Sequence, residues 1–121
     1  MLGRPVSTFA RYWRPMQEHL RPLAPTRPQH PPPGGAVDCH AHIFGPLERF
    51  PVAEERSYDA VELPAERYLE MLDAIGLAGG VVVTASAYGT DNRALTHALT
   101  AFPGRLRARD IWCFARATNS L

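Results

Sequence analysis

The chain has 121 residues, of which 45% are hydrophobic and 21% charged, a composition that suits one globular domain and excludes a chain disordered throughout. The formal net charge is +1 and the arginines are spread along the chain, so neither nucleic acid nor an anionic membrane is expected as a partner. The two cysteines, Cys39 and Cys113, form no CxxC pair and no apolar run is long enough to cross a membrane, so we expect a cytoplasmic protein.

Residues 1–35 differ from the rest of the chain in composition. Eight of the twelve prolines lie there, and the stretch ends in PQHPPPGG. Proline fixes φ and removes a backbone donor, so neither a helix nor a central strand is expected. The beginning is rich in arginine and lacks acidic residues, which leaves an organellar transit segment open as an alternative. We predict a disordered, proline- and arginine-rich extension in front of the folded part.

From residue 36 onward, strands and helices are predicted in alternation. AVDCHAHI has the pattern of a first strand, and a polar connection of about 20 residues follows it. PAERYLEMLDAIG predicts an amphipathic helix with proline at its start and glycine at its end. GGVVVTASA is typical of a buried parallel strand, and TDNRALTHALTAFPG predicts a second amphipathic helix. This order indicates an α/β fold in which right-handed crossovers join parallel strands.

The first predicted strand carries two histidines at its end. Residues two apart in a strand face the same side, so Asp38, His40 and His42 are expected on one face and Ala41 on the other. Imidazole nitrogen is a favoured zinc ligand, but most isolated HxH pairs are packed or solvated histidines. Here a Gly-Pro turn and a connection much longer than a usual βα loop follow the pair. This context favours a functional site at the strand's end.

Three motifs in this chain resemble one known family. They are VDCHAHIFGP, the loop element RFPVAEERSY and the second-strand element SAYGTDNRAL. In this order they are similar to the amino-terminal part of the amidohydrolase superfamily, in the amidohydrolase-related branch that includes 2-pyrone-4,6-dicarboxylate lactonase. The resemblance covers residues 36–107 and implies a distorted TIM-type (β/α)8 barrel. It also implies hydrolysis of esters, lactones or amides, or decarboxylation, usually at one or two divalent metal ions.

The resemblance further implies roles for four residues. His40 and His42 match the catalytic first-strand pair and would be the ligands of a zinc or manganese ion if metal is used, although the lactonase branch is thought to need none. Tyr58 and Ser86 match residues that help bind a substrate carboxylate, so the expected partner is a small molecule with carboxylate groups. From the residues alone, Tyr58 is equally explained by a ring covering the core edge, and Ser86 by a hydroxyl satisfying a turn.

Other polar residues near these motifs have simpler explanations. Asp91 and Asn92 are expected to cap the second predicted helix rather than to touch substrate. Arg49 and Arg56 are expected to lie in solvent, although either one would attract a carboxylate. His97 falls on the polar face of the second predicted helix and is assigned no role.

The chain contains only part of the pattern that a whole barrel needs. Such a barrel requires about 250 residues, and only its first two βα units are predicted here, with residues 108–121 forming a divergent tail. Asp38 is a poor substitute for the base that activates water. We expect a lactone or ester hydrolase by descent whose chain is truncated and inactive by itself. The alternatives are a non-catalytic fragment that associates through an exposed sheet edge, and a small metal-binding module.

Overall fold

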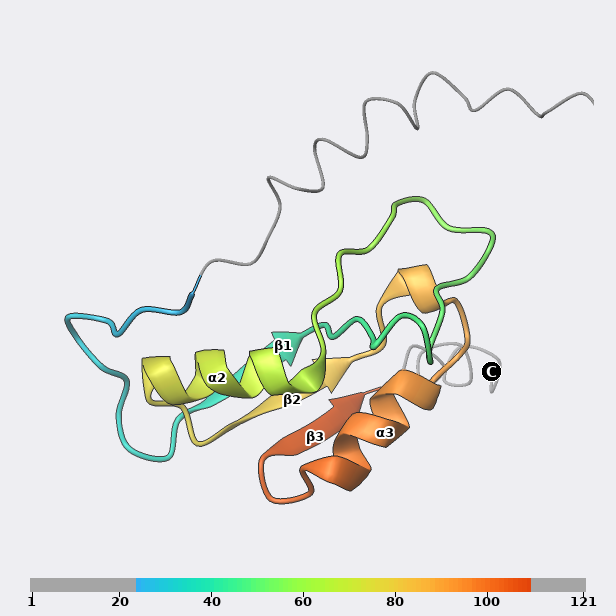
Figure 1. Cartoon of the computed structure of the whole chain (residues 1–121). Coiled ribbons are helices and arrows are strands. Elements are labelled where there is room, and N and C mark those ends of the chain that lie inside the picture. Colours follow the sequence, from blue (N-terminus) through green and yellow to red (C-terminus); the bar gives the residue numbers. More distant parts are fainter. Residues whose placement is uncertain (1–23, 110–121) are drawn as a thin grey trace, which may run out of the picture.

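The computed structural model describes residues 24–109 of the chain (Figure 1). Its elements are three strands, β1 (Val37–Ala41), β2 (Gly79–Val83) and β3 (Leu106–Arg109), two α-helices, α2 (Ala65–Ile75) and α3 (Arg93–Ala101), and the short 3-10 helix η1 (Ser86–Tyr88). Those parts of the predicted extension and tail that fall on residues 1–23 and 110–121 lie outside the described residues. Residues 24–35 form neither helix nor strand, in agreement with their proline content.

The three strands form one parallel sheet in the order β1-β2-β3. Helix α2 connects β1 to β2, helix α3 connects β2 to β3, and both helices cover the same face of the sheet (Figure 1). This is the arrangement that right-handed crossovers produce between neighbouring parallel strands. The predicted α/β fold with parallel strands is therefore confirmed.

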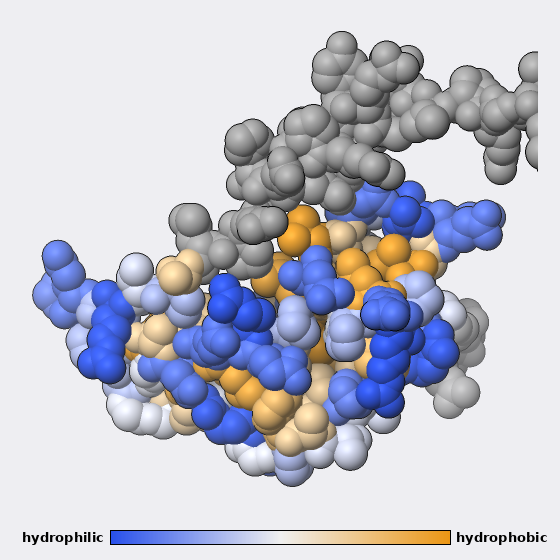
Figure 2. Space-filling model, in the orientation of Figure 1, coloured by the Kyte–Doolittle hydropathy of each residue, from blue (hydrophilic) through white to orange (hydrophobic). Residues whose placement is uncertain are grey.

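The core lies between this face of the sheet and the two helices. Its most deeply buried side chains are Val82 of β2, Leu72 of α2 and Leu106 of β3. Burial of each such side chain stabilises the fold by roughly 1.5–3 kcal/mol. Polar side chains cover much of the outer surface of the helices, with hydrophobic side chains visible between them (Figure 2). Among the described residues, no helix is both long and apolar enough to cross a membrane.

Helix α2 begins and ends close to the residues that the sequence predicts. Pro64 is its N-cap residue, where the missing backbone N–H costs no hydrogen bond. Gly76 ends the helix in the left-handed conformation, with φ 91°, and its N–H donates to the carbonyl of Leu72. The amphipathic pattern buries Tyr68 and Leu72 toward the sheet.

The third strand is a correction to the sequence analysis, which allowed for only two βα units. Leu106 is the only one of the four residues of β3 that is buried, and the segment LRAR carries two arginines, so it lacks the β-branched pattern of a buried strand. Strand β3 nevertheless pairs along four residues of β2, from Gly80 opposite Leu106 to Val83 opposite Arg109. Backbone pairing and a single buried leucine hold this strand, and the predicted tail boundary at residue 108 falls inside it.

Candidate functional site

Strand β1 contains an irregularity that changes which side chains face the helices. Asp38 pairs with Gly80 of β2, but Ala41 pairs with Val82, so between these pairs β1 has two residues where β2 has one. The Asp38 carboxylate bonds to α2, and Ala41 packs on the core beneath the same helix. The prediction that Asp38 and Ala41 face opposite sides was therefore wrong, because a bulge of one extra residue shifts the alternation along the strand.

His40 and His42 lie together at the end of β1. Their ring centroids are 5.0 Å apart and the rings meet edge to face, at 85°. Both side chains are exposed in the described part of the chain. Nδ1 of His42 lies 2.9 Å from the carbonyl oxygen of Val83 at the end of β2. A carbonyl only accepts, so Nδ1 carries the proton, and in the neutral ring the lone pair is on Nε2.

The histidine pair meets part of the requirement for a divalent metal. A ring nitrogen whose partner nitrogen donates to a carbonyl is the usual arrangement of a metal-bound histidine, and His42 has it. A catalytic zinc site needs about three protein ligands. Within residues 24–109, however, no group of three or more His, Cys, Asp or Glu side chains is placed to hold an ion. The described residues thus fit two ligands of a metal site and do not complete one.

A cavity of about 330 Å³ opens beside β1 and α2. Its wall is mainly apolar and comes from β1, the end of the long connection, α2 and the extension; the lining residues are Pro25, Ala41, His42, Leu63, Arg67, Tyr68 and Met71. Of the four predicted site residues, only His42 lines it. A single concavity shared by all four residues therefore stays a prediction.

Residues 45–63 form the long connection, which packs on η1 beyond the ends of β1 and β2 (Figure 1). The N–H of Ala53 donates to the carbonyl of Ala87 in η1, and Phe50 is buried against the same region. At the root of the connection, the N–H of Gly45 donates to the Tyr88 hydroxyl at 2.7 Å. Burial raises the pKa of Tyr88. The connection is thus anchored where the sequence predicts a functional loop.

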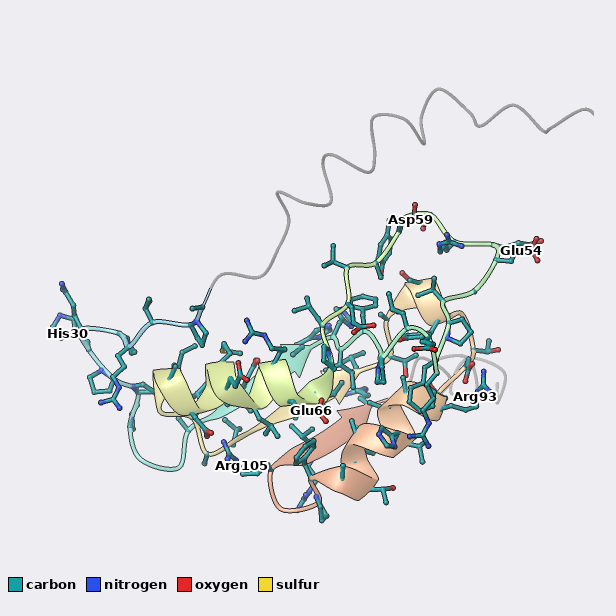
Figure 3. All side chains as sticks on the ribbon, in the orientation of Figure 1. His30, Glu54, Asp59, Glu66, Arg93 and Arg105 are labelled. Carbon is teal, nitrogen blue, oxygen red and sulfur yellow. The ribbon has the colours of Figure 1, made fainter. Side chains whose placement is uncertain are left out.

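Tyr58 lies in the outer part of this connection and is 40% exposed. Its ring meets Phe44 edge to face at 6.3 Å, and Phe44 in turn stacks on Tyr88 of η1. Glu54 and Asp59 mark the outer tip of the connection (Figure 3), where Asp59 pairs with Arg56. The ring contact is the packing role that the residues alone allowed for Tyr58.

Ser86 is the first residue of η1, three residues after the carbonyl that binds His42. Its side chain is exposed, and its own carbonyl accepts from the N–H of Gly89. It therefore lies beyond the carboxyl end of β2, as expected. Within the described part of the chain, neither Ser86 nor Tyr58 is hydrogen-bonded to the histidine pair, so their substrate-binding roles stay predictions.

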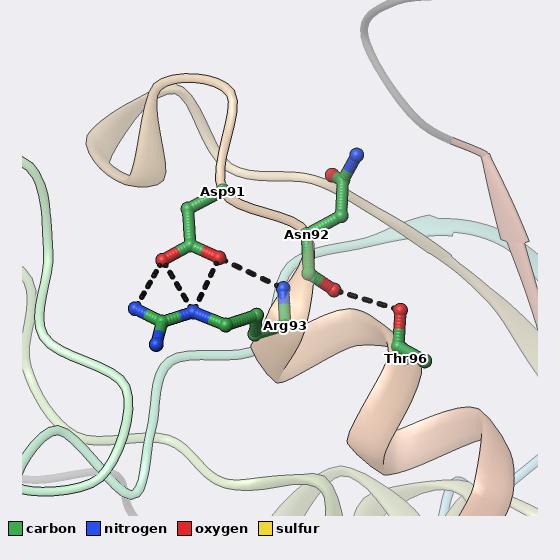
Figure 4. Close-up of polar contacts among 4 residues, drawn as sticks. All are labelled: Asp91, Asn92, Arg93 and Thr96. Atoms are coloured by element: carbon green, nitrogen blue, oxygen red, sulfur yellow. Dashed lines mark hydrogen bonds and ion pairs between the residues drawn. The ribbon is translucent and has the colours of Figure 1, made fainter.

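Of the two residues predicted to cap the second helix, Asp91 binds the first backbone N–H, whereas Asn92 is the N-cap residue but makes no side-chain capping bond (Figure 4). Asp91 accepts from the N–H of Arg93 at 3.0 Å and also pairs with the Arg93 guanidinium, which lowers the pKa of the Asp91 carboxyl. The Asn92 side chain instead accepts from the Thr84 hydroxyl, at 2.6 Å, and its backbone carbonyl accepts from the Thr96 hydroxyl. Both residues stabilise the start of α3.

Arg49 and Arg56 are exposed, as expected, and both also have local partners. The Arg56 guanidinium also donates to the carbonyl of Ala53, and the Arg49 guanidinium lies over the ring of Phe50 at 5.0 Å. Phe50 also contacts the ring of His97, at 5.3 Å. The contact with His97 joins the long connection to α3, whereas the contacts of Arg49 and Arg56 lie within the connection.

Sequence reasoning did not find a contact between β1 and α2. The Tyr68 hydroxyl donates to Oδ2 of Asp38 at 2.9 Å, while Oδ1 of the same carboxylate accepts from the N–H of His40 at 3.2 Å. Tyr68 looks like an ordinary core residue in its helix. The signal available in the sequence is the glycine pair before the valines, because a side chain at Gly80 would collide with the Tyr68 ring.

Comparisons with known proteins agree with this geometry. The amidohydrolase family profile matches residues 37–111. The chain is 41% identical over 83 residues to a 2-pyrone-4,6-dicarboxylate hydrolase of Comamonas testosteroni, covering 69% of this chain and 27% of that protein. It is 34% identical over 92 residues to a 4-sulfomuconolactone hydrolase of Hydrogenophaga intermedia, covering 76% of this chain and 29% of that protein.

Two solved structures share the fold. A probable 2-pyrone-4,6-dicarboxylic acid hydrolase of Acinetobacter baumannii, with citric acid bound, matches with a TM-score of 0.56 at 29% identity, over 61% of this chain and 27% of that one. A protein of Agrobacterium tumefaciens matches with a TM-score of 0.62 at 23% identity, over 75% of this chain and 32% of that one, which shows the fold alone. The chain thus spans little more than a quarter of the curated relatives that it matches. With the family profile matching more than half of its length, the chain belongs to the amidohydrolase family.

Proposed function

We propose that this chain supplies the first-strand histidine pair of a hydrolase that acts on a lactone carrying carboxylate groups. The observation that carries the proposal is the contact of His40 with His42, with Nδ1 of His42 bonded to Val83 and Nε2 left available. Two relatives are named as hydrolases of a pyrone dicarboxylate and of a sulfomuconolactone, and both names describe a lactone with acidic groups. The Acinetobacter structure holds citric acid, which also carries carboxylates.

Hydrolysis of a lactone requires water to add to the ring carbonyl carbon while the ring C–O bond breaks. The water gives up a proton, the ring oxygen leaves and takes one, and the product carries a new carboxyl group. In this scheme the imidazoles of His40 and His42 would lie beside the carbonyl, where Nε2 of His42 would accept a hydrogen bond from the attacking water or would be a ligand of a divalent metal. A divalent metal, when bound, would polarise that carbonyl. Tyr58 and Ser86 would bind the substrate's carboxylate.

We further propose that the 121-residue chain has no lactonase activity by itself. Both histidines are exposed, and the residues from 24 to 109 offer no third group beside them for a metal. Groups exposed to water do not keep the placement that catalysis needs, and a reaction without a positioned base typically loses a further factor of about 10² to 10⁴.

A chimera tests whether the histidine pair of this chain supports lactone hydrolysis. Residues 37–109 would replace the matching segment of the Comamonas hydrolase, with hydrolysis of 2-pyrone-4,6-dicarboxylate as the assay. The folded chimera should hydrolyse the lactone, and His40→Ala and His42→Ala should each lower kcat/KM at least 100-fold. Arg93→Ala, an exposed change on α3, is the matched control and should leave activity unchanged. A folded chimera whose activity is unchanged by both histidine substitutions would overturn the proposal.

A direct assay tests the proposal that the chain has no lactonase activity by itself. The purified 121-residue chain is given 2-pyrone-4,6-dicarboxylate and simple aryl lactones, with and without zinc or manganese, beside the double variant His40→Ala, His42→Ala. We expect hydrolysis no faster than in buffer. Turnover that disappears in the double variant would show that this chain carries out the chemistry unaided.

A sheet-edge interaction module is the second candidate, because β1 and β3 are the edges of the described sheet and Val37 on β1 is 53% exposed. Two features of these edges oppose it. Strand β1 carries a bulge, and β3 carries Arg107 and Arg109, and both features are common on edges that do not pair. Light scattering during size-exclusion chromatography separates the two candidates. A concentration-dependent dimer that dissociates when Val37 is changed to Lys would favour the interaction module.

A further inference from the structure

We propose that Asp38 and Tyr68 form a positioning pair that holds the bulge of β1 and thereby sets the placement of His40 against His42. The two residues join β1 to α2 through one hydrogen bond. The consequence of this pair for catalysis rests on the proposed function. Its structural role stands independently of that function.

The bulge needs such a support because it interrupts the ladder to β2. Between Asp38 and Ala41 the pairing shifts by one residue, and His40 lies within this interval. The N–H of His40 donates to Oδ1 of Asp38, two residues earlier, at 3.2 Å. A short side chain that accepts from the backbone two residues on is a common way to stabilise a local turn. The direction of His40 therefore depends on where the Asp38 carboxylate is held.

Tyr68 holds that carboxylate from the other side. Its hydroxyl donates to Oδ2 at 2.9 Å, and the residue is only 8% exposed. Burial and the bond to Asp38 raise the pKa of Tyr68 well above its ordinary value of 10.0, so the hydroxyl remains a donor across the physiological range. One carboxylate thus joins helix α2 to the backbone of His40 through its two oxygens.

Gly80 makes the contact geometrically possible. It is the residue of β2 that pairs with Asp38, and a Cβ added there would overlap the Tyr68 hydroxyl and ring. The tyrosine therefore lies directly on the bare backbone of the central strand and reaches Asp38 across it. A glycine in the middle of a strand weakens that strand, so its presence here is explained by the close approach of the ring.

The second contact that fixes the histidine pair is the hydrogen bond from His42 to the carbonyl of Val83. One histidine is held through its backbone by Asp38, and the other through its ring by the carbonyl of β2. The two rings then meet at 5.0 Å. If Asp38 loses Tyr68, the carboxylate that binds the His40 N–H is no longer held by α2, and the contact between the rings should loosen.

The test uses NMR on the full 121-residue chain with Tyr68→Phe, Asp38→Ala and Asp38→Asn. The first two should weaken the nuclear Overhauser contacts between the rings of His40 and His42 and speed amide exchange at His40 by about tenfold or more. Asp38→Asn should restore both, because its amide oxygen can accept from His40 and its NH₂ can donate to the Tyr68 oxygen. Leu106→Val, a core change on β3, is the control for lost stability and should leave the ring contacts unchanged.

In the active chimera, Tyr68→Phe should lower kcat by about 10-fold to 100-fold with little change in KM, since misplacement of a reacting group acts mainly on the transition state. Ring contacts and His40 exchange that are the same in Tyr68→Phe and Asp38→Ala as in the parent chain would overturn the positioning role. Ring contacts that loosen while every chimera is inactive would support the positioning role and count against the proposed function. The two failures are therefore distinguishable.

Discussion

The imidazole of His42 donates from Nδ1 to the carbonyl oxygen of Val83, 2.9 Å away, and so joins the end of β1 to the end of β2. This bond determines which nitrogen of the ring faces outward. It also means that the His42 imidazole joins two neighbouring parallel strands at their carboxyl ends, where active sites of α/β folds are built.

The first prediction concerns the tautomer of His42. In the ¹⁵N spectrum of the 121-residue chain, the neutral form of the His42 ring should be protonated at Nδ1. His30 is the control, because it is exposed at the other end of the molecule and hydrogen-bonds no described residue (Figure 3). It should show the mixture of tautomers of a free histidine. A proton on Nε2 of His42 would contradict the bond to Val83.

The second prediction concerns the proposed carboxylate-binding residues. In the active chimera, Tyr58→Phe and Ser86→Ala should each raise KM for 2-pyrone-4,6-dicarboxylate by about 10-fold to 100-fold, the effect of losing a hydrogen bond to a charged group. Tyr58→Phe keeps the ring contact with Phe44, so a pure packing role predicts no change. Thr100→Ala on α3 is the control for Ser86→Ala. An unchanged KM in either variant removes that residue from the site.

The third prediction is a pH dependence of stability at the start of α3. The pKa of Asp91 is lower in the folded than in the unfolded chain, so its ion pair stabilises the fold above about pH 4 and this contribution disappears as pH falls through the folded-state pKa. Asp91→Asn should therefore lower the free energy of unfolding at pH 7 by a few tenths to about 1 kcal/mol, because the side chain of Arg93 is 66% exposed and that of Asp91 31% exposed.

The difference between Asp91→Asn and the parent chain should shrink as pH falls below 4, in urea denaturation followed by circular dichroism. Glu54→Gln, at the outer tip of the long connection and without an ion pair in the described part, should unfold like the parent at pH 7. A difference for Asp91→Asn that grows toward low pH would contradict the ion pair with Arg93.

The fourth prediction concerns the core. Leu72 is fully buried between α2 and the sheet, so Leu72→Ala should lower the free energy of unfolding by about 2–5 kcal/mol. Val37→Ala removes a half-exposed side chain at the sheet edge and should change it by less than about 0.5 kcal/mol. Urea denaturation measures both. Equal losses in the two variants would show that the described core does not hold the fold.

Much of the local structure follows from the sequence because it depends on short-range signals. Helix α2 ends at Gly76 because a residue with positive φ is needed there, and Pro64 precedes it because its missing N–H costs nothing. The β-branched run of β2 and the apolar face of α3 likewise identify buried surfaces from the residue pattern alone. Residues 36–107 also resemble the right family, which the family profile confirms.

The third strand and the bulge in β1 could not be predicted in this way. Strand β3 is held by backbone bonds to β2 and by one buried leucine, neither of which leaves a pattern in LRAR. The bulge depends on the pairing between β1 and β2, so the simple alternation of side chains misplaced Asp38 and Ala41. Pairing register is a property of two strands together.

The sequence by itself determined the alternation of strands and helices, the family, and the presence of two histidines at the end of a strand, because each rests on periodicity or on residues close together in the chain. Only the tertiary structure decided how those histidines are held. Tyr68 reaches Asp38 from 30 residues away over the bare backbone of Gly80, and Val83 reaches His42 from 41 residues away. Such contacts exist only once the helix and both strands have packed, since hydrogen bonds between distant residues depend on distance in space and not on distance along the chain.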